Sequence, residues 1–178
     1  MIKKNNKKLF SEVKKFKVEI NKKKNKYFFN QKIDVLVNLQ QSLINGDILK
    51  HPRYGIWSLH LADINFQRNG HVGFWEILEK KNKIGITLQR LKDNVDAGDI
   101  IEIKNYKIKA PSLKSQIFLQ EKSCDLIIKN LKKITFDKIK FKFFINKSLK
   151  TYRSYPTIFK TIRYTYISMI NIIFKKNF

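Results

Sequence analysis

The sequence predicts an α/β fold with a mostly parallel sheet, and three neighbouring segments lead to this prediction. Residues 33–39 are rich in β-branched side chains, which favour a strand. Residues 41–50 fit a short helix with Gly46 as a break inside it, and residues 56–59 are an apolar run that predicts a buried strand. Strand, helix and strand at this spacing are typical of a βαβ unit with a right-handed crossover.

Apolar spacing predicts the elements that follow this unit. Residues 60–72 form a polar loop, and residues 74–81 form a helix with one apolar face. Two further strands are expected at residues 85–91 and 100–103. Alternation along the first of them places Ile86 and Leu88 on one face and Thr87 and Gln89 on the other.

A long helix is expected next, opened by Pro111-Ser112 and ending near Ile134. Its buried stripe would consist of Leu113, Ile117, Cys124, Ile128 and Leu131. Because Cys124 is the only cysteine, no internal disulfide can form, and a reducing, cytoplasmic location is favoured. Its place on the apolar stripe predicts a buried structural thiol rather than a reactive one.

The last part of the chain predicts a final helix after Tyr155-Pro156. Its apolar side would hold Ile158, Ile162, Thr165, Met169 and Ile172, with Lys160 and Arg163 on another side. Docking on the core is the plainer interpretation, and a place on an anionic membrane surface is the alternative. Before this helix, residues 136–145 partly alternate Phe and Lys and predict an edge strand.

The net charge of +24 is concentrated at the two ends of the chain. It is +9 over residues 1–50, +1 over residues 51–100 and +14 over residues 101–178. This distribution predicts a basic N-terminal arm at 1–32, an α/β domain at 33–134 and a basic C-terminal extension at 135–178. Two explanations of this charge stay open. One is a compositional bias of the source toward Lys, Asn and Ile, and the other is a partner that is a polyanion or an anionic membrane. No secretory signal and no apolar run of about 18 residues is present in the sequence.

Polar residues gather where the strand at 56–59 ends. Ser58 and His60 project to one face, because side chains alternate along a strand. In open α/β sheets, ligands bind beyond the carboxyl ends of strands, which is where His60 would lie. Asp96, in a turn marked by Gly98 after the next strand, can be brought beside it. We therefore expect the site at this pair, and Arg90 is a further candidate to hold a carboxylate or phosphate.

From Asp34 to about Ile101, the sequence resembles the catalytic domain of the folate-dependent formyltransferases, which include the methionyl-tRNA and glycinamide ribonucleotide enzymes. The matching features are the strand ending in His60, the Gly-containing loop and helix, Gly-Ile-Thr-Leu at 85–88, and Asp96 within residues 95–101. Gly-Ile-Trp-Ser-x-His at 55–60 and Gly-Phe-Trp-Glu at 73–76 resemble an uncharacterised branch of that family.

The resemblance implies a Rossmann-like, mostly parallel sheet, shortened at the N-terminus and followed by a helical extension. It implies 10-formyltetrahydrofolate as formyl donor and an amine acceptor, with a nucleotide-linked amino sugar of a cell-surface precursor as one acceptor class. His60 would stabilise the oxyanion or accept the amine proton, and Asp96 would orient the imidazole. The implied site residues are Asp93, Val95 and Gly98 for the folate and Asp63, Arg68 and Gly70 for the acceptor. No metal site is expected.

Two departures from the family pattern leave alternatives open. Ser58 stands where most members carry Asn, and its shorter hydroxyl donates one hydrogen bond without the second function of an amide. In addition, only about 33 lysine-rich residues precede Asp34, where the family has a full strand-helix-strand half. The alternatives are a catalytically impaired remnant that binds a polyanion, and a methionyl-tRNA formyltransferase whose basic flanks grip RNA.

Overall fold

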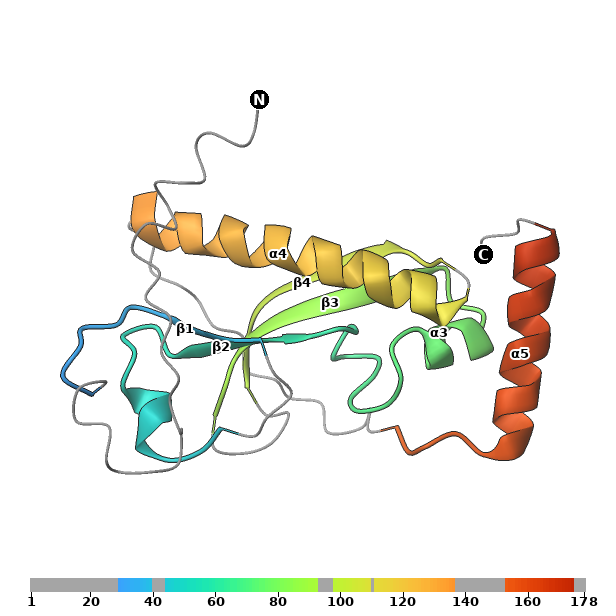
Figure 1. Cartoon of the computed structure of the whole chain (residues 1–178), viewed down its shortest axis with the longest axis horizontal. Helices are drawn as coiled ribbons and strands as arrows, with labels where there is room; N and C mark the ends of the chain where they lie inside the picture. The colour runs from blue at the N-terminus through green and yellow to red at the C-terminus, as the bar shows by residue number, and fades with distance from the viewer. Residues whose placement is uncertain (1–28, 40–43, 93–97, 110, 137–152, 175–178) are drawn as a thin grey trace. The chain divides into compact units, whose positions relative to one another are not determined.

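A computed structural model describes residues 29–39, 44–92, 98–109, 111–136 and 153–174 of the chain. Contacts divide the chain into residues 1–32 and residues 33–178, and the fold described below is that of the second unit. Its elements, in chain order, are β1 (Leu36–Asn38), the 3₁₀-helix η1 (Asp47–Lys50), β2 (Ile56–His60), α3 (Phe74–Leu78), β3 (Lys83–Arg90), β4 (Asp99–Lys107), α4 (Ser112–Phe136) and α5 (Ile158–Ile173) (Figure 1).

The described strands form one mixed sheet in the order β1-β2-β3-β4. β1 and β2 are parallel, whereas β2–β3 and β3–β4 are antiparallel. The α/β class is therefore confirmed, but the expectation of a mostly parallel sheet is wrong. The 22 residues between β2 and β3 contain the five-residue α3, and β3 pairs antiparallel with β2. The chain consequently re-enters the sheet at the end where it left.

Most of the predicted strands and helices form within a few residues of their expected limits. β4 is longer than expected, because its pairing with β3 continues to Lys107. The short helix expected over 41–50 is seen as the four residues of η1, and residues 40–43 lie outside the described part. Of the expected edge strand at 136–145, Phe136 ends α4 and the other residues lie outside the described part.

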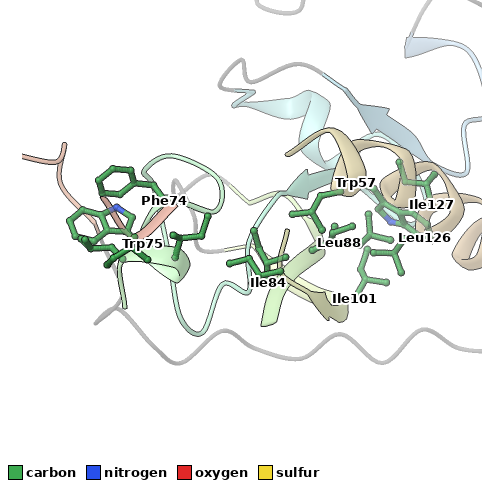
Figure 2. Close-up of a cluster of buried hydrophobic side chains, with 14 residues drawn as sticks. Trp57, Phe74, Trp75, Ile84, Leu88, Ile101, Leu126 and Ile127 are labelled. Atoms are coloured by element: carbon green, nitrogen blue, oxygen red, sulfur yellow. The ribbon is translucent and has the colours of Figure 1, made fainter. Parts of the chain in front are cut away.

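One face of the sheet carries the hydrophobic core, and α4 covers that face. Ile84 lies between the Phe74–Trp75 pair and a group around Trp57 and Leu88 (Figure 2). Trp57, Ile86 and Leu88 are fully buried. Along this face, α4 contributes Leu119, Leu126 and Ile127. On the next strand, Glu102 binds α4 through Lys129, Asn130 and Lys133.

The stripe predicted to be the buried side of α4 is wrong. Leu113 and Ile117 are 62% and 51% exposed, and Cys124 is an exposed free thiol rather than a buried one. The buried side instead holds Ser115, Leu119, Ser123, Leu126, Ile127 and Asn130. Small polar residues can face the sheet here because their groups are bonded: Ser123 Oγ donates to Leu119 O at 2.7 Å and Asn130 Nδ2 donates to Leu126 O at 2.9 Å. The helix is thus rotated relative to its most apolar stripe.

The final helix α5 packs against α3, but not through its predicted apolar side. Tyr164 stacks on Phe74 with ring centroids 4.6 Å apart, and its hydroxyl donates to Ser112 Oγ at 2.7 Å. Ile167 is buried with this face, whereas Ile158 and Met169 of the predicted stripe are 70% and 58% exposed. Among the residues that the structure describes, none of the helices combines the length and apolar character that a bilayer span requires.

Candidate active site

The second face of β2 and β3 is polar, and it brings together residues from three strands. In the sheet register, His60 pairs with Thr87 and Ser58 pairs with Gln89. Because residues paired across strands share a face, these four side chains lie on the face opposite the core. On its other side, Ser58 is in register with Asn38 of β1. A hydroxyl is thus flanked on neighbouring strands by two carboxamide side chains.

His60 is held at the end of β2 by the loop that follows it. Its Nε2 lies 2.8 Å from the backbone oxygen of Gln67. A carbonyl can only accept a hydrogen bond, so this contact assigns the ring proton to Nε2. In the neutral imidazole, Nδ1 is then the nitrogen that can take up a proton.

The loop itself is pinned to β3 through Thr87. The Thr87 hydroxyl donates to Ala62 O at 2.8 Å and accepts from the backbone N–H of Ile64 at 3.1 Å. The loop also lies directly on Gly85, where an added Cβ would stand 2.6 Å from the backbone nitrogen of Asp63. His60 is therefore followed by a rigid segment rather than a free one.

Asp63, predicted to bind the acceptor, lies in this pinned loop. Its Oδ1 accepts from the backbone N–H of Asn65 at 2.9 Å, and its Oδ2 accepts from Asn105 Nδ2 at 3.4 Å. The backbone oxygen of Asp63 closes the turn by accepting from Phe66 and Gln67. These contacts give the carboxylate a structural role, and acceptor binding by Asp63 stays a prediction.

At the other end of the polar face, Gly98 closes over Gln89. A Cβ at Gly98 would stand 2.5 Å from Arg90 O and 3.2 Å from Gln89 Oε1, so only glycine permits this approach. Gln89 is 5% exposed, and its Oε1 has no hydrogen-bond partner within the described residues. The structure thus leaves a buried amide with an unused acceptor beside Ser58.

Asp93, Val95 and Asp96 lie outside the described residues, so their predicted roles stay predictions. The residues on either side of this segment are described. Arg90 and Lys92 both form ion pairs with Asp99, the second at 2.5 Å. Burial opposes ionisation of Asp99, but hydrogen bonds from Lys92 and Arg90 outweigh it and hold its pKa below the ordinary range. Arg90, considered as a ligand-binding residue, is therefore engaged with Asp99.

A pocket of about 480 Å³ lies near the starts of α3 and α4. It is lined by Asn69, Gly70, His71, Val72, Phe74, Ser112, Leu113, Gln116 and Tyr155. Gly70, predicted to bind the acceptor, has φ +99°, and an added Cβ would stand 3.0 Å from Trp75 Nε1. The side-chain amide of Gln67 donates to His71 O at 3.3 Å. Gln67 therefore touches both the pocket wall and, through its backbone oxygen, His60.

Two buried charged residues lie in the segment from Arg68 to Glu76. Arg68 is 3% exposed, its backbone oxygen accepts from the Arg153 N–H at 2.8 Å, and its Nε and Nη2 lack partners within the described residues. Its predicted acceptor role stays a prediction. Burial raises the pKa of Glu76 to about 7, against smaller lowering effects of backbone N–H groups and Arg153. Neither Glu76 carboxylate oxygen has a partner in the described part of the chain.

Three residues of this arrangement were missed at the level of sequence: Asn38, Gln67 and Gln89. Alternation placed Gln89 on the face of Thr87, but only the register shows that it stands beside Ser58. Asn38 enters the same row through the parallel pairing of β1. Gln67 acts on His60 through its backbone, which leaves no signal in the residue type.

Sequence comparisons relate part of the chain to formyltransferases. No family model matches the chain. A methionyl-tRNA formyltransferase from Prochlorococcus marinus is 29% identical over 105 residues, which are 58% of this chain and 31% of that protein. The match thus spans about a third of that relative's length.

Solved structures share the fold. The formyltransferase PseJ from Anoxybacillus kamchatkensis, solved with UDP-4,6-dideoxy-4-formamido-L-AltNAc and tetrahydrofolate, has a TM-score of 0.60 and 18% identity, with 87% of this chain and 79% of that chain covered. A 4-N formyltransferase from Francisella tularensis has a TM-score of 0.58 and 18% identity, with coverages of 74% and 59%. At these identities the likeness shows the fold. The expected resemblance to the formyltransferases is confirmed in both sequence and fold.

Proposed function

We propose that this chain, which has the fold of the formyltransferases, transfers the formyl group of 10-formyltetrahydrofolate to the amine of a nucleotide-linked amino sugar. The observation that carries the proposal is that His60 and Ser58 share one polar face with the buried amide of Gln89, which lies in register with Ser58. The acceptor class is supported by the solved complex of PseJ, whose ligands are a nucleotide-linked formamido sugar and tetrahydrofolate.

His60 acts as the proton acceptor in the proposed reaction. The amine nitrogen attacks the formyl carbon, a C–N bond forms, and the carbonyl electrons move to oxygen. The nitrogen then loses a proton to Nδ1 of His60, which is available because Nε2 is bound to Gln67 O. When the tetrahedral intermediate collapses, the bond from the formyl carbon to the folate nitrogen breaks, and that nitrogen receives the proton. Asp96 orients the imidazole in this scheme.

The oxyanion of the intermediate needs hydrogen-bond donors, and Ser58 supplies only one. We assign a second donor to the side-chain NH₂ of Gln89, a residue that lies in register with Ser58 and is buried. Asn38 completes the row on the other side of Ser58. The amide that most formyltransferases carry at the position of Ser58 is then replaced by an amide on the neighbouring strand.

The acceptor occupies the pocket near α3 and α4 in this proposal. Its wall offers two rings, His71 and Tyr155, which are in edge contact with centroids 6.1 Å apart, and the amides of Asn69 and Gln116. Rings of this kind suit the flat base and the sugar of a nucleotide sugar, and amides suit its hydroxyls. Gly70 keeps the wall open.

The test is an assay of the purified chain with 10-formyltetrahydrofolate and a panel of nucleotide-linked amino sugars. Release of tetrahydrofolate and the mass of the formamido product are measured. His60→Ala should lower the rate by roughly 10²- to 10⁴-fold, because it removes the proton acceptor. His51→Gln is the matched control, since His51 lies outside the polar face, and it should keep the rate. If the wild-type chain releases no tetrahydrofolate with any acceptor and binds no folate, the proposal is wrong.

A second candidate acceptor is initiator methionyl-tRNA, because the Prochlorococcus relative bears that activity in its name and the ends of this chain are strongly basic. Formylation of methionyl-tRNA with a steep salt dependence would favour it over the amino sugar. RNA binding without any formyl transfer would instead indicate the catalytically impaired, polyanion-binding remnant.

A further inference from the structure

The most apolar surface of α5 faces away from the rest of the fold. Ile158, Phe159, Ile162, Tyr166, Met169 and Ile173, here called the apolar band, are each 58–80% exposed. At 100° per residue, the six positions fall within an arc of about 100°, so they form one continuous strip along the helix. A strip of this size on a single helix is larger than scattered surface apolar residues and marks an interaction site.

The band cannot turn inward, because α5 is fixed by its opposite face. Tyr164 stacks on Phe74, and its hydroxyl is bonded to both the backbone N–H and the Oγ of Ser112, at 3.0 and 2.7 Å. Lys160 lies over the Trp75 ring at 4.9 Å, and Ile167 is buried. The side facing the fold also contains the buried polar residues Ser168 and Asn171. The helix is therefore oriented with Tyr164, Ile167, Ser168 and Asn171 inward and the apolar band outward.

The charge of the sequence that contains α5 indicates what covers the band. Residues 138–178 contain ten Lys or Arg and no acidic residue, and Arg163 borders the band on the helix. We propose that the apolar band docks on the surface of an anionic lipid bilayer, with α5 lying in the plane of the interface. The apolar side chains would enter the acyl boundary while Arg163 contacts the headgroups.

A second copy of the chain and a nucleic acid each fit the charge or the band, but not both. A second copy of the chain would bring two molecules with a net charge of +24 together. A nucleic acid would satisfy the lysines but would leave the isoleucines and the methionine of the band without apolar partners. An anionic bilayer satisfies both at once. This inference does not depend on the proposed formyl transfer.

Vesicle flotation with the full chain tests the proposal. Vesicles of phosphatidylcholine alone are compared with vesicles that also contain phosphatidylglycerol, at a salt concentration that releases polylysine from the latter. The wild-type chain should stay bound to the anionic vesicles under these conditions. Ile162→Ser with Tyr166→Ser should weaken binding by roughly tenfold for each side chain, because each loses its burial in the acyl boundary. Ile117→Ser, which changes an equally exposed residue on α4, is the matched control and should bind like wild type.

A dye at the band gives a second readout that folding defects do not mimic. In a Cys124→Ser background, Met169→Cys carries a polarity-sensitive dye, and Ile117→Cys carries the same dye as control. Emission should shift to the blue on anionic vesicles for the first variant only. The proposal is wrong if the wild-type chain and the band variants float equally, or if the dye at residue 169 does not shift. It is also wrong if sedimentation shows a dimer that Ile162→Ser dissociates.

Discussion

The two faces of the β2–β3 pair are buried to a similar degree but by different means. On one face, Trp57, Ile86 and Leu88 lie beneath α4 and pack within the apolar core cluster. On the other face, Thr87 and Gln89 are as deeply buried, yet they meet the backbone of the 61–67 loop and Gly98. Burying polar groups is costly unless they are hydrogen-bonded. The apolar face thus accounts for stability, and the polar face is the place to look for chemistry.

The largest expected effect on stability comes from a substitution on the apolar face. Leu88→Ala removes a fully buried side chain, so the free energy of unfolding should fall by about 2–5 kcal/mol. Denaturant unfolding followed by tryptophan fluorescence measures this loss. The transferase rate per folded molecule should change by less than twofold. A large loss of rate at unchanged stability would show that the two faces do not divide their roles.

Glu76 lies on neither face of the β2–β3 pair, and it tests separately what burial of an ionisable group does to stability. Its pKa of about 7, against 4.5 for an unperturbed Glu, means that between those pH values the native chain keeps a proton that the unfolded chain has lost. The free energy of unfolding should therefore fall as the pH rises from about 4.5 to 7, by on the order of 3 kcal/mol, and level off above. Glu76→Gln should remove this slope.

Glu121→Gln is the control for that pH dependence, since Glu121 is exposed on α4 and is not among the groups that shift the pKa of Glu76. Its stability should follow the wild-type pH profile. Denaturant midpoints at a series of pH values measure both variants. A Glu76→Gln profile that keeps the full slope would contradict the assignment to Glu76.

On the polar face, Gln89 tests the proposed second oxyanion donor. Gln89→Leu keeps the volume but removes the amide, and we expect kcat to fall by roughly ten- to a hundredfold with little change in KM. Ser58→Asn restores the amide at the position where most formyltransferases have it, and in the Gln89→Leu background it should recover part of kcat. If Gln89→Leu leaves kcat unchanged and Ser58→Asn does not raise it, Gln89 takes no part in the reaction.

Thr87 gives the smallest expected effect on stability. Thr87→Val keeps the shape but leaves Ala62 O and the Ile64 N–H without their partner, so the free energy of unfolding should fall by about 1–2 kcal/mol. Because the same loop holds His60, hydrogen exchange of the Ile64 amide should also accelerate. If exchange is unchanged, Thr87 does not pin the loop.

The sequence predicted the features of the polar face that depend on neighbouring residues, but not those that depend on residues far apart in the chain. Alternation is local, so it correctly separated Ser58 and His60 from Trp57 on β2. Register is not local, and the neighbours of Ser58 on β1 and β3 became visible only when the strands were paired. The direction of β3 was also missed, because it is set by pairing with β2 and β4, which leaves no local signal in the sequence.

The two long helices show why apolar spacing predicts a helix better than its orientation. For α4 and α5, the helices were predicted within a few residues, but most of each expected stripe is exposed, although Leu131 of α4 packs against the core. In α4, serine and asparagine turn inward because their side chains bond to carbonyls one turn earlier. In α5, the contact of one tyrosine with Phe74 and Ser112 fixes the rotation. Such pairings join residues far apart in the chain.

Gln67 has a consequence for how the site responds to its ligands. Its backbone oxygen holds the imidazole of His60, its side-chain amide holds the backbone of His71, and the residue is 1% exposed. It has no room to adapt independently at either end. One buried residue therefore bridges the backbone of the pocket wall and the His60 ring, and in the proposed reaction a ligand that displaced His71 would be expected to shift that ring through Gln67.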